Sequence, residues 1–320
     1  MKRQYLCIIA AAAVSLMPAG FAWAAEVKIA VFTKNLTNPA YEAARRGVDL
    51  VAAESGATTV HFVPQDPDNV EQQKALVEAA LAEKPDIVIF VPVDDKAMVP
   101  DAKKFADAGI PVVSFINRLE GEFVAHVGSD DVAVGYNGAE ALFEGLGGTG
   151  TVLAIEGNPA APTSRDRVAG MHNAVGEFPG IKLLEVVRGM YQEDPAYQVT
   201  AAALQKYPEI DGIWAANDVM VYGALKALRE ANRSAKLVGA NGLDKAIQLI
   251  EGGTMLATVE FSAFKIACTA ARAGLKHLAG EAVPAEIIVP SVLITASNLE
   301  PWKVPLDQRP CPSWEEMVQN

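Results

Sequence analysis

The sequence predicts a doubly wound α/β protein with two similar lobes, and three observations support this class. Apolar runs alternate with segments of helical spacing along most of the chain. Several runs are apolar almost throughout, as in "DIVIFVP" at 86–92 and "GIPVVSF" at 109–115, which is typical of strands covered on both faces in a parallel sheet. The runs number ten, too many for one ordinary sheet, so we expect two parallel-sheet lobes.

The strands are expected in two groups of five. The first group comprises 27–32, 58–63, 86–91, 111–115 and 124–127. The second group comprises 151–155, 182–187, 212–216, 236–240 and 255–259. Helical faces between the strands are marked by apolar residues three and four positions apart, namely Met98, Ala102, Phe105 and Ala106, and later Val221, Ala224, Leu225 and Leu228.

Residues 1–24 have the pattern of a secretory signal peptide. Lys2 and Arg3 precede an apolar stretch at 6–14, and small residues then allow cleavage after Ala24. The apolar stretch is too short for a stable membrane anchor, and no later stretch is apolar enough to span a bilayer. We therefore expect a soluble exported protein of about 296 of the 320 residues.

Composition excludes several classes of function. Removal of the signal peptide takes the net charge from −12 to −14, which disfavours contact with a nucleic-acid backbone. The four histidines are not spaced as metal ligands, and neither a serine elbow nor a phosphate loop is present. No G-x-G-x-x-G follows the first strand, so a nicotinamide site is unsupported. We expect no metal and no cofactor.

The residues that follow the predicted strands are rich in amides, arginines and aromatic rings. In doubly wound sheets, ligands bind at the carboxyl ends of the strands. Asn offers both a donor and an acceptor to a sugar hydroxyl, and Arg offers a fixed fork of donors. The positions concerned are Asn38, Tyr41, Asn117, Arg118, Arg165, Tyr191, Asn217, Asn241, Glu260 and Phe261. Such a set favours a hydroxyl-rich ligand.

Six motifs carry a resemblance to a known family. They are "TNPAYEAARRG", "IPVVSFINR", "HVGSDDVAVG", "TSRDRVAGM", "WAANDVMVYGALKAL" and "LVGANG". In their order and spacing, the chain resembles the ribose- and galactose-binding branch of the periplasmic sugar-binding proteins from 26 to about 298. These proteins feed ABC importers and share a fold with sugar-responsive repressors of the LacI class. The repressors need an N-terminal DNA-reading domain, and this chain has a signal peptide instead.

The resemblance implies a periplasmic binding protein of type 1, with two lobes joined by a three-stranded hinge. The first lobe would be 26–129 plus 262–290, and the second 130–261 plus 291–298. Residues 299–320 extend past the family's common end, and their two tryptophans favour a strap packed on the surface over a disordered tail.

Two cysteines, Cys268 and Cys311, remain after signal cleavage. An oxidising compartment allows a disulfide that ties the strap to the domain. Two unpaired thiols, with Cys268 buried on a helix, are the alternative.

The resemblance places Asn38 and Tyr41 against the ligand in the first lobe. Asn38 would hydrogen-bond the ligand, although it also suits a helix N-cap before Pro39. Tyr41 would stack on a sugar ring, with core packing as the alternative. Ala40 stands where the family often has a second aromatic ring, so the stacking wall is thinner here.

Two arginines are expected to hold the ligand. Asn117 and Arg118 match a family pair, and Arg118 would form a fork to the ligand, with a surface ion pair as the alternative. Arg165 in "TSRDR" matches the second ligand arginine, whereas Arg167 is expected to be structural and paired with an acid.

In the second lobe, Tyr191 would supply an aromatic wall and Asn217 in "AAND" an amide. Asp218 is expected to start the next helix.

Three positions depart from the family pattern. Asn241 replaces an Asp, Phe261 stands where Gln or Asn is common, and Val91 stands where a polar contact is common. Glu260 could restore a negative charge, and Lys34 could add a positive one. A buried unpaired charge is costly, so either an acid pairs with the arginines or the ligand is anionic.

We expect a solute-binding receptor of an ABC importer, which closes its lobes on a small sugar, polyol or related compound and then docks on a membrane permease. A receptor for a sugar acid or another small carboxylate is the alternative. An exported glycoside-acting enzyme would need two carboxylates across the cleft, and no acid has an obvious mate, so no enzyme is expected. A chemoreceptor partner is compatible with binding, and a monomer is expected.

Overall fold

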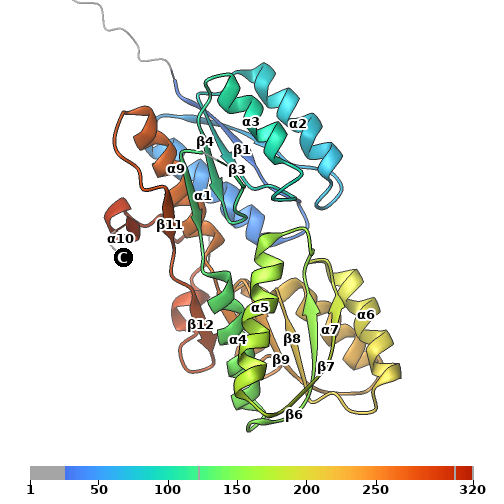
Figure 1. Ribbon diagram of the computed structural model, residues 1–320. Coiled ribbons are helices and arrows are strands. Elements are labelled where there is room, and N and C mark those ends of the chain that lie inside the picture. Colours follow the sequence, from blue (N-terminus) through green and yellow to red (C-terminus); the bar gives the residue numbers. More distant parts are fainter. Residues whose placement is uncertain (1–25, 122, 306–307, 319–320) are drawn as a thin grey trace, which may run out of the picture.

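The computed structural model describes residues 26–121, 123–305 and 308–318, and they form two α/β lobes side by side (Figure 1). Each lobe contains a six-stranded sheet with helices on both faces. The predicted fold class is therefore confirmed. Residues 1–25, which include the expected signal peptide and its cleavage point, lie outside the described part of the chain.

The first sheet is parallel throughout, in the order β11-β5-β4-β3-β1-β2. Its strands are β1 (Lys28–Phe32), β2 (Thr58–Phe62), β3 (Ile87–Phe90), β4 (Val112–Phe115), β5 (Ala125–Gly128) and β11 (Glu286–Ile288). Its helices are α1 (Pro39–Ser55), α2 (Val70–Glu83), α3 (Val99–Asp107) and α9 (Ala263–Leu278). Alternate side chains of β1 and β3 pack against α1 and α9 on one face and against α2 and α3 on the other, as expected for strands buried on both faces.

The second sheet has the order β12-β10-β9-β8-β6-β7, and only its edge strand β12 is antiparallel. Its strands are β6 (Thr149–Glu156), β7 (Gly180–Arg188), β8 (Gly212–Ala215), β9 (Lys236–Ala240), β10 (Ala257–Glu260) and β12 (Val292–Thr295). Its helices are α4 (Asp131–Gly145), α5 (Pro162–Glu177), α6 (Glu193–Lys206), α7 (Asp218–Glu230) and α8 (Asp244–Glu251).

The chain passes between the lobes in three places, after β5, after β10 and after β11. The two short strands β11 and β12, on either side of the third passage, are not predicted from the sequence. Their three and four residues give too little alternation to separate a strand from a loop. Sheet pairing with β5 and β10 decides their conformation instead.

The described part of the C-terminal strap, 299–305 and 308–318, runs along one side of both lobes (Figure 1). Its turn η1 (Glu300–Lys303) packs on α8 of the second lobe, and Lys303 forms an ion pair with Glu251. Its helix α10 (Trp314–Val318) packs on α9 and β11 of the first lobe. Cys311 forms a disulfide with Cys268 in the middle of α9. The strap thus contacts both lobes and is covalently fixed to the first.

Within the described residues, no helix combines the length and apolar character needed to cross a membrane.

Candidate functional site

A narrow cavity lies between the lobes, where the carboxyl ends of the two sets of strands face each other. The centre of a water-sized sphere can occupy about 20 Å³ of it in this closed arrangement. First-lobe residues that line it are Asn35, Asn38, Ala40, Tyr41, Asp68 and Ile116. Second-lobe and hinge residues that line it are Thr163, Arg167, Tyr191, Asn217, Asn241 and Phe261. Of the predicted positions, Asn38, Tyr41, Tyr191, Asn217, Asn241 and Phe261 are therefore brought together.

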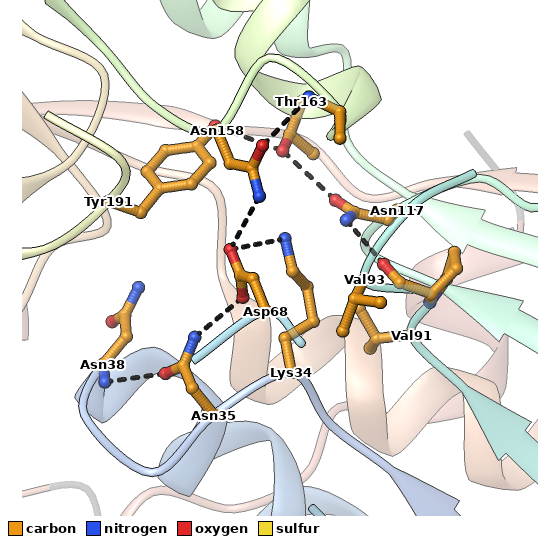
Figure 2. Close-up of polar contacts among 12 residues, drawn as sticks. Lys34, Asn35, Asn38, Asp68, Val91, Val93, Asn117, Asn158, Thr163 and Tyr191 are labelled. Carbon is orange, nitrogen blue, oxygen red and sulfur yellow. Dashed lines mark hydrogen bonds and ion pairs between the residues drawn. The ribbon is translucent and has the colours of Figure 1, made fainter. Parts of the chain in front are cut away.

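The floor of the cavity in the first lobe is built around Asp68 (Figure 2). Lys34 is buried after β1, and its Nζ lies 3.3 Å from Oδ2 of Asp68. The Asn35 amide donates to Oδ1 of Asp68 at 3.1 Å. From the second lobe, the Asn158 amide donates to Oδ2 at 3.3 Å. The charge of Lys34, which the sequence placed near the ligand, is thus compensated by a carboxylate of its own lobe.

Asn38 caps a helix and also lines the cavity. Its Oδ1 accepts a hydrogen bond from the backbone N–H of Ala40 at 3.0 Å, which caps α1 through the side chain. The same residue lines the cavity, and the Asn241 amide donates to its Oδ1 at 3.4 Å from the second lobe. Tyr41, one turn into α1, is 8 % exposed, and burial raises the pKa of its hydroxyl well above the usual value.

Arg167 lines the cavity, whereas Arg165, which was expected to hold the ligand, is not among the lining residues. Arg167 is 3 % exposed, its Nε donates to Asp131 at 2.7 Å, and its guanidinium lies 4.7 Å from the centre of the Phe261 ring. Burial alone lowers the pKa of Arg167, but the Asp131 carboxylate outweighs this effect and raises it. The contact with Asp131 holds the guanidinium in place as part of the cavity wall.

Two glycines bring α4 and α5 close enough for this pair. A Cβ on Gly135 would collide with the backbone of Arg167, and a Cβ on Gly170 would collide with the backbone of Val132. The close approach places Asp131, at the start of α4, beside Arg167 on α5.

Arg165 and Arg118 lie outside the cavity lining. Arg165 and Arg167 are two residues apart on α5, so their side chains leave the helix on nearly opposite faces. Arg165 therefore points away from the cavity and pairs with Asp95 at 2.6 Å across the mouth of the cleft. Arg118 is half exposed and forms an ion pair with Glu286 at the edge of the first sheet. This surface pair is the alternative that the sequence left open for Arg118. The preceding Asn117 turns inward and is fully buried.

Asn117 helps to connect the lobes behind the cavity (Figure 2). Its Nδ2 donates to the carbonyl of Pro92 at 3.0 Å, and its Oδ1 accepts from the Thr163 hydroxyl at 3.1 Å. The Thr163 hydroxyl also lies 3.2 Å from the Tyr191 hydroxyl. Asn117 therefore supports the cavity wall through Thr163 instead of lining it.

The second-lobe wall is formed by Tyr191 and Asn217. A Cβ on Gly157 would collide with the Tyr191 ring, so this glycine makes room for the aromatic wall. Asn217 caps α7, because its Oδ1 accepts from the backbone N–H of Met220 at 2.9 Å. Asp218 begins α7 as expected, and burial raises the pKa of its carboxyl to about 7.

At the end of β10, Phe261 and Glu260 face different spaces. Phe261 lines the cavity, whereas Glu260 lines a neighbouring groove. Glu260 is 7 % exposed and does not pair with Arg118, Arg165 or Arg167. The arginines are compensated by Glu286, Asp95 and Asp131 instead.

Sequence reasoning missed Asp68 and Asn35 as cavity residues. An available signal was position, because Asp68 lies in the loop that follows the strand at 58–62, at its carboxyl end. Its backbone has a φ of 57°, and Ile116, Tyr191 and Asn241 also have positive φ. Such conformations are uncommon for these residue types and cluster at functional sites. Four of them around one cavity make it the candidate functional site.

Five polar contacts join the lobes across the cleft, and we call them the cross-cleft contacts. They are Asn158–Asp68 at 3.3 Å, Asn241–Asn38 at 3.4 Å, Thr163–Asn117 at 3.1 Å, Thr37–Gln192 at 2.9 Å and Arg165–Asp95 at 2.6 Å.

Comparison with known proteins gives consistent matches over most of the chain. The model of the periplasmic binding protein domain matches residues 29–282. The chain is 30% identical over 304 residues to the D-apiose import binding protein of Paraburkholderia graminis, covering 93% of this chain and 96% of that protein. It is 28% identical over 313 residues to the D-allose-binding periplasmic protein of Escherichia coli K12, covering 91% and 99%.

Solved structures share the fold. An ABC transporter periplasmic solute binding protein from Actinobacillus succinogenes 130z, with bound D-allose, has a TM-score of 0.82 at 29% identity and covers 86% of this chain and 100% of its own. Two lobes, three passages between them and a polar cavity in the cleft agree with these matches. The chain belongs to the periplasmic binding protein family, in the type 1 branch of sugar-binding receptors that serve ABC importers.

Proposed function

We propose that the protein binds an uncharged, polyhydroxylated small molecule, a sugar or a polyol, in the cavity between its lobes. The observation that carries this proposal is the charge balance of the cavity. Lys34 is paired with Asp68, and Arg167 is paired with Asp131. With both buried cations compensated, an anionic ligand would leave its own charge without a free partner, which is costly in a desolvated site.

The polar groups of the cavity suit hydroxyl groups. Amides of Asn35, Asn38 and Asn241 combine donors and acceptors, as each sugar hydroxyl requires. The rings of Tyr41 and Tyr191 supply flat apolar surfaces for the C–H faces of a sugar. The names of relatives support the same class, because they specify D-apiose and D-allose.

Entry of the ligand requires the lobes to separate. The space of about 20 Å³ in the closed arrangement holds little more than one water molecule. Hinge opening at the three passages would admit a pentose or hexose, and closure would trap it. For this motion we propose lobes of 26–129 with 262–290 and of 130–261 with 291–298.

Isothermal titration against pentoses, hexoses, alditols and the matching aldonates tests the proposal. We expect one or more neutral compounds to bind, with the aldonate of the best sugar at least tenfold weaker. The affinity should change little between low and high salt, because no net charge is neutralised on binding. Folded, ligand-free protein that binds no neutral compound would contradict the proposal. A preference for the aldonate would favour the sugar-acid alternative instead.

We also propose that the protein acts in transport without catalysis. Its family consists of solute-binding receptors. The Asp68 carboxylate, which lines the cavity, and the Asp131 carboxylate, which pairs with the lining residue Arg167, are each bound to a cation and serve as structural anions. A membrane permease of an ABC importer is the expected partner of the closed form, with a chemoreceptor as a further candidate. The proposed working form is a periplasmic monomer released by cleavage after Ala24.

A further inference from the structure

A groove beside the cavity is larger than the cavity itself. The centre of a water-sized sphere can occupy about 460 Å³ of the groove, compared with about 20 Å³ of the cavity. One wall is the first turn of α1 with Pro39 and Ala43, and the other is formed by α7 and the start of α8. Phe264 of α9 and Arg309 of the strap complete it. The groove therefore lies between the lobes, next to the proposed ligand.

Ala40 and Asn241 line both spaces and form the junction between them. The Ala40 side chain is a single methyl group, and an aromatic ring at this position would fill the junction. With only this methyl group present, the Asn241 side chain separates the two spaces. Its Nδ2 lies 3.4 Å from Oδ1 of Asn38, which is long for a hydrogen bond. A ligand group can pass this junction without breaking a strong contact.

Two polar atoms of the groove have no hydrogen-bond partner among the described residues. They are the buried Oε2 of Glu260 and the buried hydroxyl of Tyr222, and each residue is 7 % exposed. Leaving such groups unsatisfied costs free energy, so native proteins usually satisfy them. Two of them on one groove, beside a ligand cavity, indicate that a bound group completes them.

The charges of the groove specify that group. Lys245 lies over the Tyr222 ring at 4.0 Å, and Arg309 lies 3.7 Å from Asp244. Glu260 has no ion pair within the described part of the chain, and burial raises the pKa of its carboxyl despite the opposing effects of Ser262, Lys265, Arg309 and Trp302. The group that is missing is therefore a cation or a strong hydrogen-bond donor.

We propose that this groove is a subsite for a substituent on the ligand, with a short apolar stem that passes Ala40 and an ammonium group that binds Glu260 and Tyr222. The inference rests on the proposed function, because the polyol portion of the ligand occupies the cavity. The apolar stem contacts Pro39, Ala43 and Phe264, and the ammonium group supplies the donors that both orphan oxygens need. The ligand class is then an amino-substituted derivative of a sugar or polyol.

The test compares matched derivatives of the best sugar from the titration panel. Both anomers of its ethyl glycoside and of its 2-aminoethyl glycoside are titrated against the wild type, Glu260→Gln and Ala40→Phe. Glu209→Gln, an exposed acid on the far side of the second lobe, is the matched control. For one anomer we expect the aminoethyl glycoside to bind at least tenfold tighter than the ethyl glycoside, as for a charge-assisted hydrogen bond.

The variants separate the subsite from the cavity. Glu260→Gln should bring the ratio of the two affinities close to one, whereas Glu209→Gln should leave it unchanged. Ala40→Phe should fill the junction and weaken both glycosides at least tenfold. A wild-type ratio near one for both anomers, or the same ratio in Glu260→Gln, would overturn the proposal.

Failure of the proposed function has a different outcome, because no sugar of the panel would then bind at all. In that case n-propylammonium is titrated alone and followed by amide NMR shifts around residues 222 and 260. Shifts that Glu260→Gln abolishes would retain the groove as an amine site. Their absence in the wild type would overturn it.

Discussion

Removal of the disulfide by Cys311→Ala should lower the free energy of unfolding by about 4 kcal/mol. The disulfide joins residues 43 positions apart, and the closed loop contains most of α9, the third passage between the lobes and the part of the strap that precedes Cys311. The chain-entropy relation for a loop of this length gives about 4 kcal/mol at 25 °C. Engineered and native disulfides often give less, so a loss of about 2–4 kcal/mol is the expected range.

Urea unfolding followed by tryptophan fluorescence and far-UV circular dichroism measures this loss. Trp302 and Trp314 lie on the strap and Trp214 lies in the second-lobe core, so the emission reports both regions. Reductant should destabilise the wild type by the same amount and leave Cys311→Ala unchanged. A variant within about 0.5 kcal/mol of the oxidised wild type would refute the loop-entropy reasoning. So would an equal effect of reductant on both proteins.

Three further perturbations test the charges around the cleft. Burial and the nearby Arg118 lower the pKa of His126 to about 3, so the folded protein resists protonation that the unfolded chain accepts below about 6.5. The free energy of unfolding therefore falls as the pH falls from 6.5 towards 3, by about 2 kcal/mol at pH 5. In urea unfolding at pH 7 and pH 5, His126→Asn should show a smaller loss than the wild type. Equal losses in the variant and the wild type would argue against the idea. Asp68→Asn leaves the Lys34 ammonium unpaired, so the best ligand of the titration panel should bind at least tenfold more weakly. An unchanged affinity would show that Asp68 is not part of the binding site. Arg167→Met leaves the Asp131 carboxylate buried alone and should lower the free energy of unfolding by about 3–5 kcal/mol, as measured by heat or urea. Adding Asp131→Asn to this variant should restore part of the lost free energy. No recovery in the double variant would contradict the pairing.

The sequence predicts the sheets better than the direction of individual side chains. Continuous apolar runs require burial on both faces, so all ten expected strands are present within a few residues of their expected limits. β11 and β12 are missing from the prediction because their pairing with distant strands, and not their own pattern, makes them strands.

The site was predicted in part, for reasons of local geometry. The expected positions at strand ends and helix starts, such as Asn38, Tyr191 and Asn217, line the cavity because these ends converge there. The choice between Arg165 and Arg167 depends on the rotation of α5, which the close packing at Gly135 and Gly170 determines. Those contacts join segments that are far apart in the sequence, so pattern alone does not reveal them.

The cross-cleft contacts have a consequence for the economy of transport. Each hydrogen bond contributes roughly 0.5–1.5 kcal/mol, and all five join groups of the protein itself, so they favour the closed form whether or not cargo is present. A cargo molecule then shifts a balance that already includes closed, empty receptors. A permease that recognised closure alone would spend ATP on empty carriers. Closure alone is therefore an ambiguous signal of bound cargo, because the protein's own contacts already favour it.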